Sequence, residues 1–184
     1  MKLTFITGNE GKWKTAQDVL GQYGHELDRK KVETPEIQSL SVEEVAAFSA
    51  EYAAKEIGQP VMVTDVGYYF SALKGFPGPF IKFLNKTLTS QDILGLVSAH
   101  DDRKVIIREC LAYCVPGEKA KVFISEQHAT LTREAQGNGS AIDNILILEG
   151  FDTTVGTTPR DKLEQYWVDK LSHYHEFGKY LAAL

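Results

Sequence analysis

The sequence predicts a single α/β domain, because strand and helix patterns alternate along its first third. Residues 2–65 read as strand, helix, strand, helix and strand, an order typical of this class. A long β-hairpin is the second observation: strand-like runs at 105–114 and 120–132 flank the turn sequence Pro116-Gly117-Glu118. The chain has 184 residues, enough for one domain with an extensive core.

The N-terminal elements follow from the spacing of apolar residues and from helix start and stop signals. In chain order we expect strand 2–6, helix 11–23, strand 27–32, helix 42–57 and strand 60–64. Ser41 and Glu44 have the spacing of a capping box, in which Ser41 caps the helix and Glu44 reaches back. Gly58 and Pro60 end this helix.

The remaining two thirds contain shorter elements. We expect a rigid loop at 75–79, helices around 80–86 and 90–99, a turn at 137–139 and a strand at 145–148. A helical region follows from Thr158, and its apolar face extends to Leu181, a length that fits one or two helices.

Composition and charge limit the function classes. The chain is 43% hydrophobic and 24% charged, which is typical of a soluble globular protein. A net charge of −5 argues against non-specific binding of nucleic acid or anionic membrane, but a local positive pocket for a phosphorylated compound remains compatible with it. We find no apolar run of about 20 residues that could cross a bilayer, and no signal peptide pattern.

The two cysteines, Cys110 and Cys114, lie four residues apart on one face of a predicted strand. We interpret them as buried apolar side chains, since no further Cys or His has the spacing that a zinc site needs. Low cysteine usage and the lack of a signal peptide together favour a cytoplasmic location.

A candidate phosphate site is the segment Thr7-Gly8-Asn9-Glu10-Gly11-Lys12, between the first strand and the first helix. Helix N-termini carry unpaired N–H groups and partial positive charge, glycines permit close backbone approach, and Lys12 adds a full charge. The spacing differs from a Walker A loop. The alternative is an ordinary turn in which Asn9 caps the helix.

Two acids could hold a metal ion. Asp65 directly follows the predicted strand 60–64, and open α/β sheets bind ligands at the carboxyl ends of their strands. Alternatively, Asp65 forms a turn before Gly67. Glu36 follows Pro35 in a predicted loop. Together the two carboxylates suit Mg²⁺, which binds one or two carboxylates with phosphate oxygens and water, and oxygen ligands suit Mn²⁺ as well.

Four motifs in this order resemble the inosine triphosphate pyrophosphatase family. They are T-G-N-x2-K after the first strand, P-E-I-Q in the next loop, V-T-D ending at Asp65, and the run Phe70–Lys82. Within that run, A-L-x-G-x-P-G-P-[FY]-I-K is the most specific piece. The likeness extends weakly to Ser172-His173.

The resemblance implies a fold and an assembly. The fold is an elongated mixed β-sheet flanked by helices with a central cleft, in an α/β architecture like that of anticodon-binding domains. Residues 1–184 then form one domain with two lobes. Family members are usually homodimers, and the aromatic residues at 68–83 fit core packing and a dimer contact better than base stacking.

The resemblance also implies an activity: hydrolysis of ITP, dITP and XTP to monophosphate and pyrophosphate with Mg²⁺. Asp65 is then the catalytic carboxylate that orients or deprotonates the attacking water, and Glu36 and Asp65 hold the metal. The implied substrate-binding residues are Thr7, Gly8, Asn9, Lys12, Asp143 near the base, and His173 near base or phosphate.

Several positions depart from the family pattern. The family has acids where this chain has Thr15 and Thr64, lysines at Ser49 and Val168, an arginine at Tyr174, and a tryptophan at Ile142. These losses leave two alternatives open: a homologue that binds nucleotide without turnover, and a hydrolase of another phosphorylated compound. Four nearby cations could replace the lost positive charge: Arg133, Arg160, Lys162 and Lys170.

Overall fold

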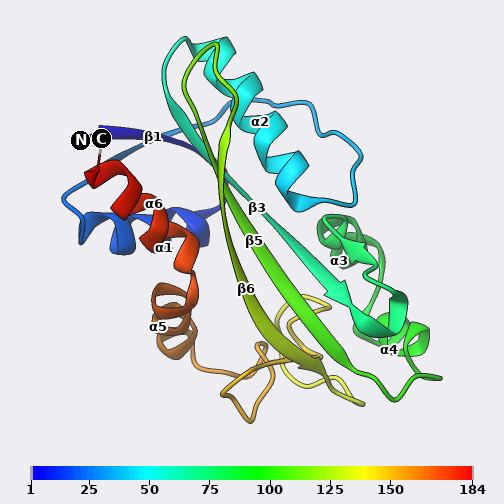
Figure 1. The fold of residues 1–184 in the computed structure, drawn as a ribbon. Helices are drawn as coiled ribbons and strands as arrows, with labels where there is room; N and C mark the ends of the chain where they lie inside the picture. Colours follow the sequence, from blue (N-terminus) through cyan, green and yellow to red (C-terminus); the bar gives the residue numbers. More distant parts are fainter. Residues whose placement is uncertain (1, 184) are drawn as a thin grey trace. The chain divides into compact units, whose positions relative to one another are not determined.

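A computed structural model describes residues 2–183. It contains two compact units. The first comprises Met1–Asp65, Glu109–Ser125 and Trp167–Leu184, and the second comprises Val66–Arg108 and Glu126–Tyr166. The principal elements, traced in Figure 1, are β1 (Lys2–Ile6), α1 (Glu10–Gly21), β2 (Glu26–Lys30), α2 (Val42–Ile57), β3 (Val61–Phe70), β4 (Pro77–Gly78), α3 (Ile81–Thr87), α4 (Ser90–Leu96), β5 (Lys104–Cys114), β6 (Lys121–Leu131), β7 (Leu146–Leu148), α5 (Arg160–Lys170) and α6 (Ser172–Ala182).

The strands form one mixed sheet. Its hydrogen-bonded order is β2-β1-β3-β5-β6-β7, and β4 pairs with β3 outside this path. β1 runs parallel to β2 and β3, whereas β4 is antiparallel to β3 and β7 to β6. A mixed sheet flanked by helices confirms the predicted α/β class.

In the first unit, helices cover both faces of the sheet. Side chains alternate along a strand, so Phe5 of β1 points to one face and Ile6 to the other. Phe5 belongs to a buried cluster with residues of α1 and α6, including Leu20 and Phe177. Ile6 belongs to a second cluster that contains the alanines of α2. Figure 1 shows α1 and α6 on one side of these strands and α2 on the other.

Asp65 lies inside a strand, which corrects one prediction. β3 extends through Val61–Phe70, far beyond the expected end at Thr64, so Asp65 neither follows the strand nor forms a turn. The extension contains the β-branched and aromatic residues that favour strands, and Tyr68 and Tyr69 pair with β4. Gly67 does not interrupt it. A Cβ there would come within 2.7 Å of the Tyr69 ring, so the glycine permits a close approach.

Helix caps agree in part with prediction. The Ser41 hydroxyl accepts a hydrogen bond from Glu44 N and caps α2, as expected. The Glu44 carboxylate, however, accepts from Ser39 Oγ, which in turn accepts from Ser41 N. The predicted reach-back of Glu44 is therefore wrong, because Ser39 takes its place.

Other expectations for the elements hold. The C-terminal region forms two helices, α5 and α6. Cys110 and Cys114 are free and buried, and both pack in the cluster beneath α2, as predicted for apolar side chains. No helix within residues 2–183 is long and apolar enough to cross a membrane.

Candidate functional site

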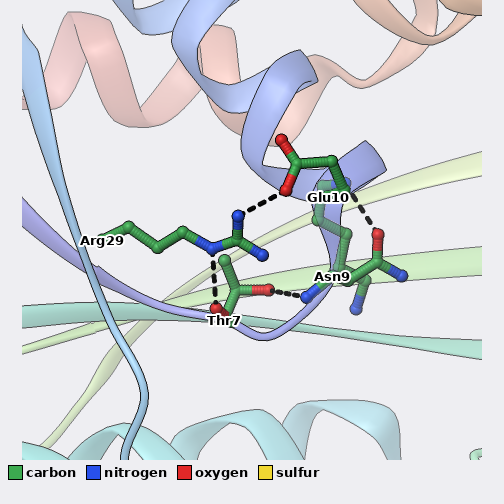
Figure 2. A network of polar contacts seen from close by, with 5 residues as sticks. Thr7, Asn9, Glu10 and Arg29 are labelled. Atoms are coloured by element: carbon green, nitrogen blue, oxygen red, sulfur yellow. Dashed lines mark hydrogen bonds and ion pairs between the residues drawn. The ribbon is translucent and has the colours of Figure 1, made fainter.

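The turn between β1 and α1 is fixed by its own side chains. Asn9 is the N-cap of α1, and its Oδ1 accepts a hydrogen bond from Lys12 N at 3.1 Å. Asn9 N donates to Thr7 Oγ1, also at 3.1 Å, as Figure 2 shows. A Cβ built at Gly8 would meet no atom within 4 Å, so space beside the turn is open. The turn thus presents the N-terminus of a twelve-residue helix to that space.

Arg29 adds a positive charge to this turn (Figure 2). It pairs in parallel register with Phe5, near the end of β1. Its Nε donates to Thr7 O at 3.1 Å, and its Nη1 lies 2.5 Å from Glu10 Oε2. Its guanidinium also lies 5.8 Å from the centre of the Trp13 ring.

Arg29 was not among the predicted replacement cations. Two of those, Arg160 and Arg133, form ion pairs within the second unit instead, with Glu164 and Asp101 respectively. Arg29 reaches the turn because β2 pairs with β1 in a register that sets Arg29 opposite Phe5. The sequence does not reveal this register between the two strands.

Lys12 connects the turn to the central strand. It lies in the first turn of α1, and its Nζ donates to the backbone oxygen of Thr64 at 2.9 Å. Lys12 is half-buried, as is Asp65, the next residue of β3. A hydrogen bond between residues 52 positions apart therefore ties the predicted phosphate-binding lysine to the backbone of the residue that precedes Asp65, the predicted catalytic carboxylate.

Glu109, on β5, is a buried acid that sequence reasoning missed. Its side chain faces the core, and the residue is only 8% exposed. Burial raises the pKa of its carboxyl to about 7; the charge of Lys12 lowers this pKa and that of Asp65 raises it. Glu109, Lys12 and Asp65 are thus electrostatic neighbours. A lone acid in the apolar run 105–114 was the available signal.

His173 lies in the first turn of α6 and is fully buried. Its Nδ1 is 2.6 Å from Ser125 Oγ, and its Nε2 has no hydrogen-bond partner among residues 2–183. Burial, followed by the charges of Lys12 and His175, lowers the pKa of His173 to about 3. The imidazole is therefore neutral at physiological pH. It can exchange hydrogen bonds with a ligand but cannot neutralise phosphate charge.

Thr64 and Tyr174, two departures from the family pattern, lie close together. Burial and then the charge of Glu109 raise the pKa of the Tyr174 hydroxyl, and Thr64 acts on it in the opposite direction. Both hydroxyls are buried, and in the described part of the chain neither has a partner at good hydrogen-bond geometry. Buried polar atoms are normally paired, and His173 Nε2 is an exception among the described residues.

Two predicted residues, Glu36 and Asp143, have roles that the structure does not test. Glu36 is exposed in the irregular segment between β2 and α2. Asp143 belongs to the second unit, where its Oδ2 accepts from Ser140 N at 3.1 Å. Their roles at metal and base remain predictions.

The predicted Mg²⁺ site would draw on few protein ligands. Within residues 2–183 no group of three or more His, Cys, Asp and Glu side chains is placed to hold a metal ion. Mg²⁺ needs only one or two carboxylates when phosphate oxygens and water complete its shell. Asp65 follows Thr64, whose backbone oxygen accepts from Lys12 Nζ, and its role as a metal ligand remains a prediction.

Fold and site together define a class: an α/β protein whose first strand–helix turn presents a helix N-terminus and a lysine next to carboxylates. The chain belongs to the Ham1 family, whose sequence model matches residues 3–173. The resemblance noted from the sequence motifs is thereby confirmed.

Similar proteins of known name agree with this membership. The chain is 40% identical over 155 residues to a dITP/XTP pyrophosphatase of Methanopyrus kandleri, covering 84% of this chain and 82% of the relative. It is 33% identical over 164 residues to the dITP/XTP pyrophosphatase of Methanosarcina acetivorans, covering 88% and 89%. A Ham1 protein from Coxiella burnetii shares the fold, with a TM-score of 0.83 at 18% identity and full coverage of both chains.

Proposed function

We propose that this chain is a Mg²⁺-dependent nucleoside triphosphate pyrophosphatase that converts deaminated purine nucleotides to monophosphate and pyrophosphate. The relatives named dITP/XTP pyrophosphatase support the reaction and the substrate class. The carrying observation is the hydrogen bond from Lys12 Nζ to Thr64 O, which brings the phosphate-type turn to the strand that holds Asp65.

The charges of the site suit this reaction. A triphosphate carries about four negative charges that repel a nucleophile, and Lys12, Arg29 and the N-terminus of α1 supply positive potential near the turn. A bound Mg²⁺ would neutralise further phosphate charge and stabilise the leaving pyrophosphate. Asp65 would accept the proton of a water molecule that attacks the anhydride between the α and β phosphates.

The uncharged cluster beside the acids suits a neutral part of the substrate. Neutral His173 with the hydroxyls of Thr64 and Tyr174 offers donors and acceptors without net charge. The family pattern has an acid at the position of Thr64 and an arginine at the position of Tyr174. We therefore expect base selectivity to differ in degree from that of the relatives.

A substrate panel tests the proposal. Purified protein is incubated with Mg²⁺ and each of ITP, XTP, dITP, ATP and GTP, and pyrophosphate and monophosphate are measured. Release from ITP, dITP or XTP well above ATP and GTP supports it. Nucleotide binding without product supports the alternative of a nucleotide-binding homologue. Turnover of other phosphorylated compounds alone supports the alternative of a hydrolase with a different phosphorylated substrate.

The role of Asp65 is tested with a matched pair of substitutions. We expect Asp65→Asn to lower kcat at least about a hundredfold, because removal of a general base typically costs this much. Asp18→Asn makes the same chemical change at an exposed position of α1 and should leave kcat unchanged. Equal activity of Asp65→Asn and the unmodified protein would remove Asp65 from the mechanism.

A further inference from the structure

Ser125 and His173 form a buried polar pair in the first unit, and the proposed reaction explains only one of them. Ser125 lies on β6 and is 4% exposed, and His173, in the first turn of α6, is fully buried. Ser125 Oγ is 2.6 Å from His173 Nδ1. The family resemblance implies a substrate role for the imidazole. The buried hydroxyl against it has no task so far.

Packing between β6 and α6 fixes these two side chains relative to each other. Side chains alternate along a strand, so Phe123 and Ser125 face the same side of the sheet. Phe177 follows His173 by one helical turn, and its ring centre lies 5.4 Å from that of Phe123. The aromatic contact and the polar contact are thus consecutive layers between the same two elements. The Tyr174 ring centre, 4.2 Å from that of the imidazole, further limits rotation of the imidazole.

The hydrogen bonds available to this pair favour one tautomer of the imidazole. His173 is neutral because burial lowers its pKa to about 3, so its single ring hydrogen lies on Nδ1 or on Nε2. With the hydrogen on Nδ1, the ring donates to Ser125 Oγ, and both the serine hydroxyl hydrogen and the Nε2 lone pair lack a partner within residues 2–183. With the hydrogen on Nε2, the serine donates to Nδ1, and only the Nε2 hydrogen lacks a partner there. Each unpaired buried group costs free energy, so the second arrangement is the more stable.

We propose that Ser125 is a positioning residue for His173: its hydroxyl donates to Nδ1 and thereby holds Nε2 as a hydrogen-bond donor for an oxygen of the nucleotide. The proposal rests on the proposed function for the identity of this ligand. A buried N–H group without a partner is costly until an acceptor reaches it. Phosphate groups and the carbonyl groups of deaminated purine bases both carry such acceptor oxygens, whereas an amino group is a donor.

Nitrogen NMR of the ligand-free protein with isotope-labelled histidines tests the tautomer and its cause at neutral pH. A protonated and an unprotonated ring nitrogen resonate far apart, and His173→Gln identifies the signals of His173. We expect an unprotonated Nδ1 and a protonated Nε2 in the unmodified protein. Ser125→Ala should shift the Nδ1 resonance, because this nitrogen loses its donor. Ser125→Thr keeps a hydroxyl and should keep the resonance near its original position.

Ser49→Ala is the matched control. Ser49 is also buried, at 8% exposed, but it belongs to α2, which packs on the opposite face of the sheet from α6. This substitution should leave both nitrogen resonances of His173 unchanged. A hydrogen on Nδ1 in the unmodified protein, or an Nδ1 resonance that Ser125→Ala leaves in place, would overturn the proposal.

Steady-state kinetics distinguish positioning from a purely structural role. We expect Ser125→Ala to raise KM for the nucleotide about fivefold with little change in kcat, a factor typical for the loss of one hydrogen bond. His173→Gln places an amide near the position of Nε2 and no atom near that of Nδ1, so Ser125→Ala should add nothing in that background. Equal effects of Ser125→Ala on KM with and without His173→Gln would show that the serine acts independently of the imidazole, contrary to the proposal.

Titration with tripolyphosphate and, separately, with inosine identifies the oxygen that Nε2 binds. Movement of the Nε2–H resonance with tripolyphosphate assigns a phosphate oxygen, and movement with inosine assigns a carbonyl oxygen. No movement with either compound at millimolar concentration would refute the donor role of Nε2.

The two proposals fail separately. Pyrophosphate release, combined with an Nδ1 resonance that is insensitive to Ser125→Ala, refutes the role of Ser125 and leaves the function intact. An Nδ1 resonance that depends on Ser125, in a protein that releases pyrophosphate from no nucleotide, leaves the positioning of His173 and refutes the function.

Discussion

Glu109 and His173 show how burial shifts the pKa values of an acid and a base in opposite directions. Burial is the largest cause for both: it raises the pKa of Glu109 to about 7 and lowers the pKa of His173 to about 3. In each case burial favours the neutral form. A site beside Lys12 and Asp65 therefore contains an uncharged imidazole and an acid that titrates near neutrality.

We predict that Glu109 makes the metal-free protein less stable as pH rises. The carboxyl has a folded pKa of about 7 and an ordinary value of 4.5, so its favourable contribution is complete below pH 4.5 and is lost up to about pH 7. Glu109→Gln removes this dependence. The unfolding free energy of Glu109→Gln should exceed that of the unmodified protein by an amount that grows from pH 4.5 to about pH 7. The added difference is on the order of 3 kcal/mol, since one pKa unit corresponds to about 1.4 kcal/mol.

Urea unfolding of both proteins in chelator, at several pH values, measures this difference. His173 acts in the reverse sense, because its lowered pKa makes stability fall as pH drops from 6.5 towards 3. Both proteins contain His173, so its contribution cancels in the comparison. A difference that stays constant from pH 4.5 to 7 would contradict the assigned environment of Glu109.

At the scale of elements, the turn between β1 and α1 both caps the helix and forms the proposed phosphate site, and Asn9 takes part in both. Asn9 caps α1 by accepting from Lys12 N, and it lies in the turn that we propose to bind phosphate. Capping is therefore compatible with ligand binding, although the sequence presented them as alternatives. The cap fixes the start of α1 next to Gly8, where a Cβ would meet no atom within 4 Å.

Two substitutions at Asn9 separate these tasks. We expect Asn9→Ala to cost about 1 kcal/mol of unfolding free energy through loss of the cap. Asn9→Asp keeps a capping oxygen and should leave stability nearly unchanged. Its added negative charge should raise KM for the nucleotide roughly five- to tenfold, since like charges about 4 Å apart in water repel by about 1 kcal/mol. Steady-state kinetics and urea unfolding measure both effects. An unchanged KM for Asn9→Asp would place the triphosphate away from this turn.

At the scale of the whole molecule, assembly is an open prediction that follows from the family resemblance. Phe76 and Phe83 are 49% and 54% exposed, which is unusual for large apolar side chains. Both lie in or near the Gly-Pro segment that the sequence motifs associate with a dimer contact. Exposed aromatic residues of this kind are expected to be covered by a partner.

We predict that the chain is a homodimer and that Phe83→Ser shifts it to monomer at micromolar concentration, because the substitution removes apolar area that the contact would bury. Sedimentation equilibrium measures the mass. Leu40→Ser, at a position that is 75% exposed, is the control and should remain dimeric. A monomeric unmodified protein would refute the prediction, and a dimer insensitive to Phe83→Ser would place the contact elsewhere.

The sequence alone determined the α/β class, most of the elements and the phosphate-type turn, because these depend on nearby residues. Apolar spacing marks α1 and α2, Asn9 caps within three residues, and the Pro116-Gly117 turn joins adjacent strands. It failed at the end of β3, since pairing with β4 extends that strand past Asp65.

Only the tertiary structure decided the composition of the site. Arg29 reaches the turn through the parallel register of β1 and β2, and Lys12 reaches β3 across 52 residues. Glu109 lies within electrostatic range of Lys12 and Tyr174 because the packing of α1 and α6 against the sheet brings these residues to one region. Each strand pattern specifies which side chains face inward. Which inward-facing polar groups meet depends on the register between strands and on the docking of helices, so the composition of the site required the fold.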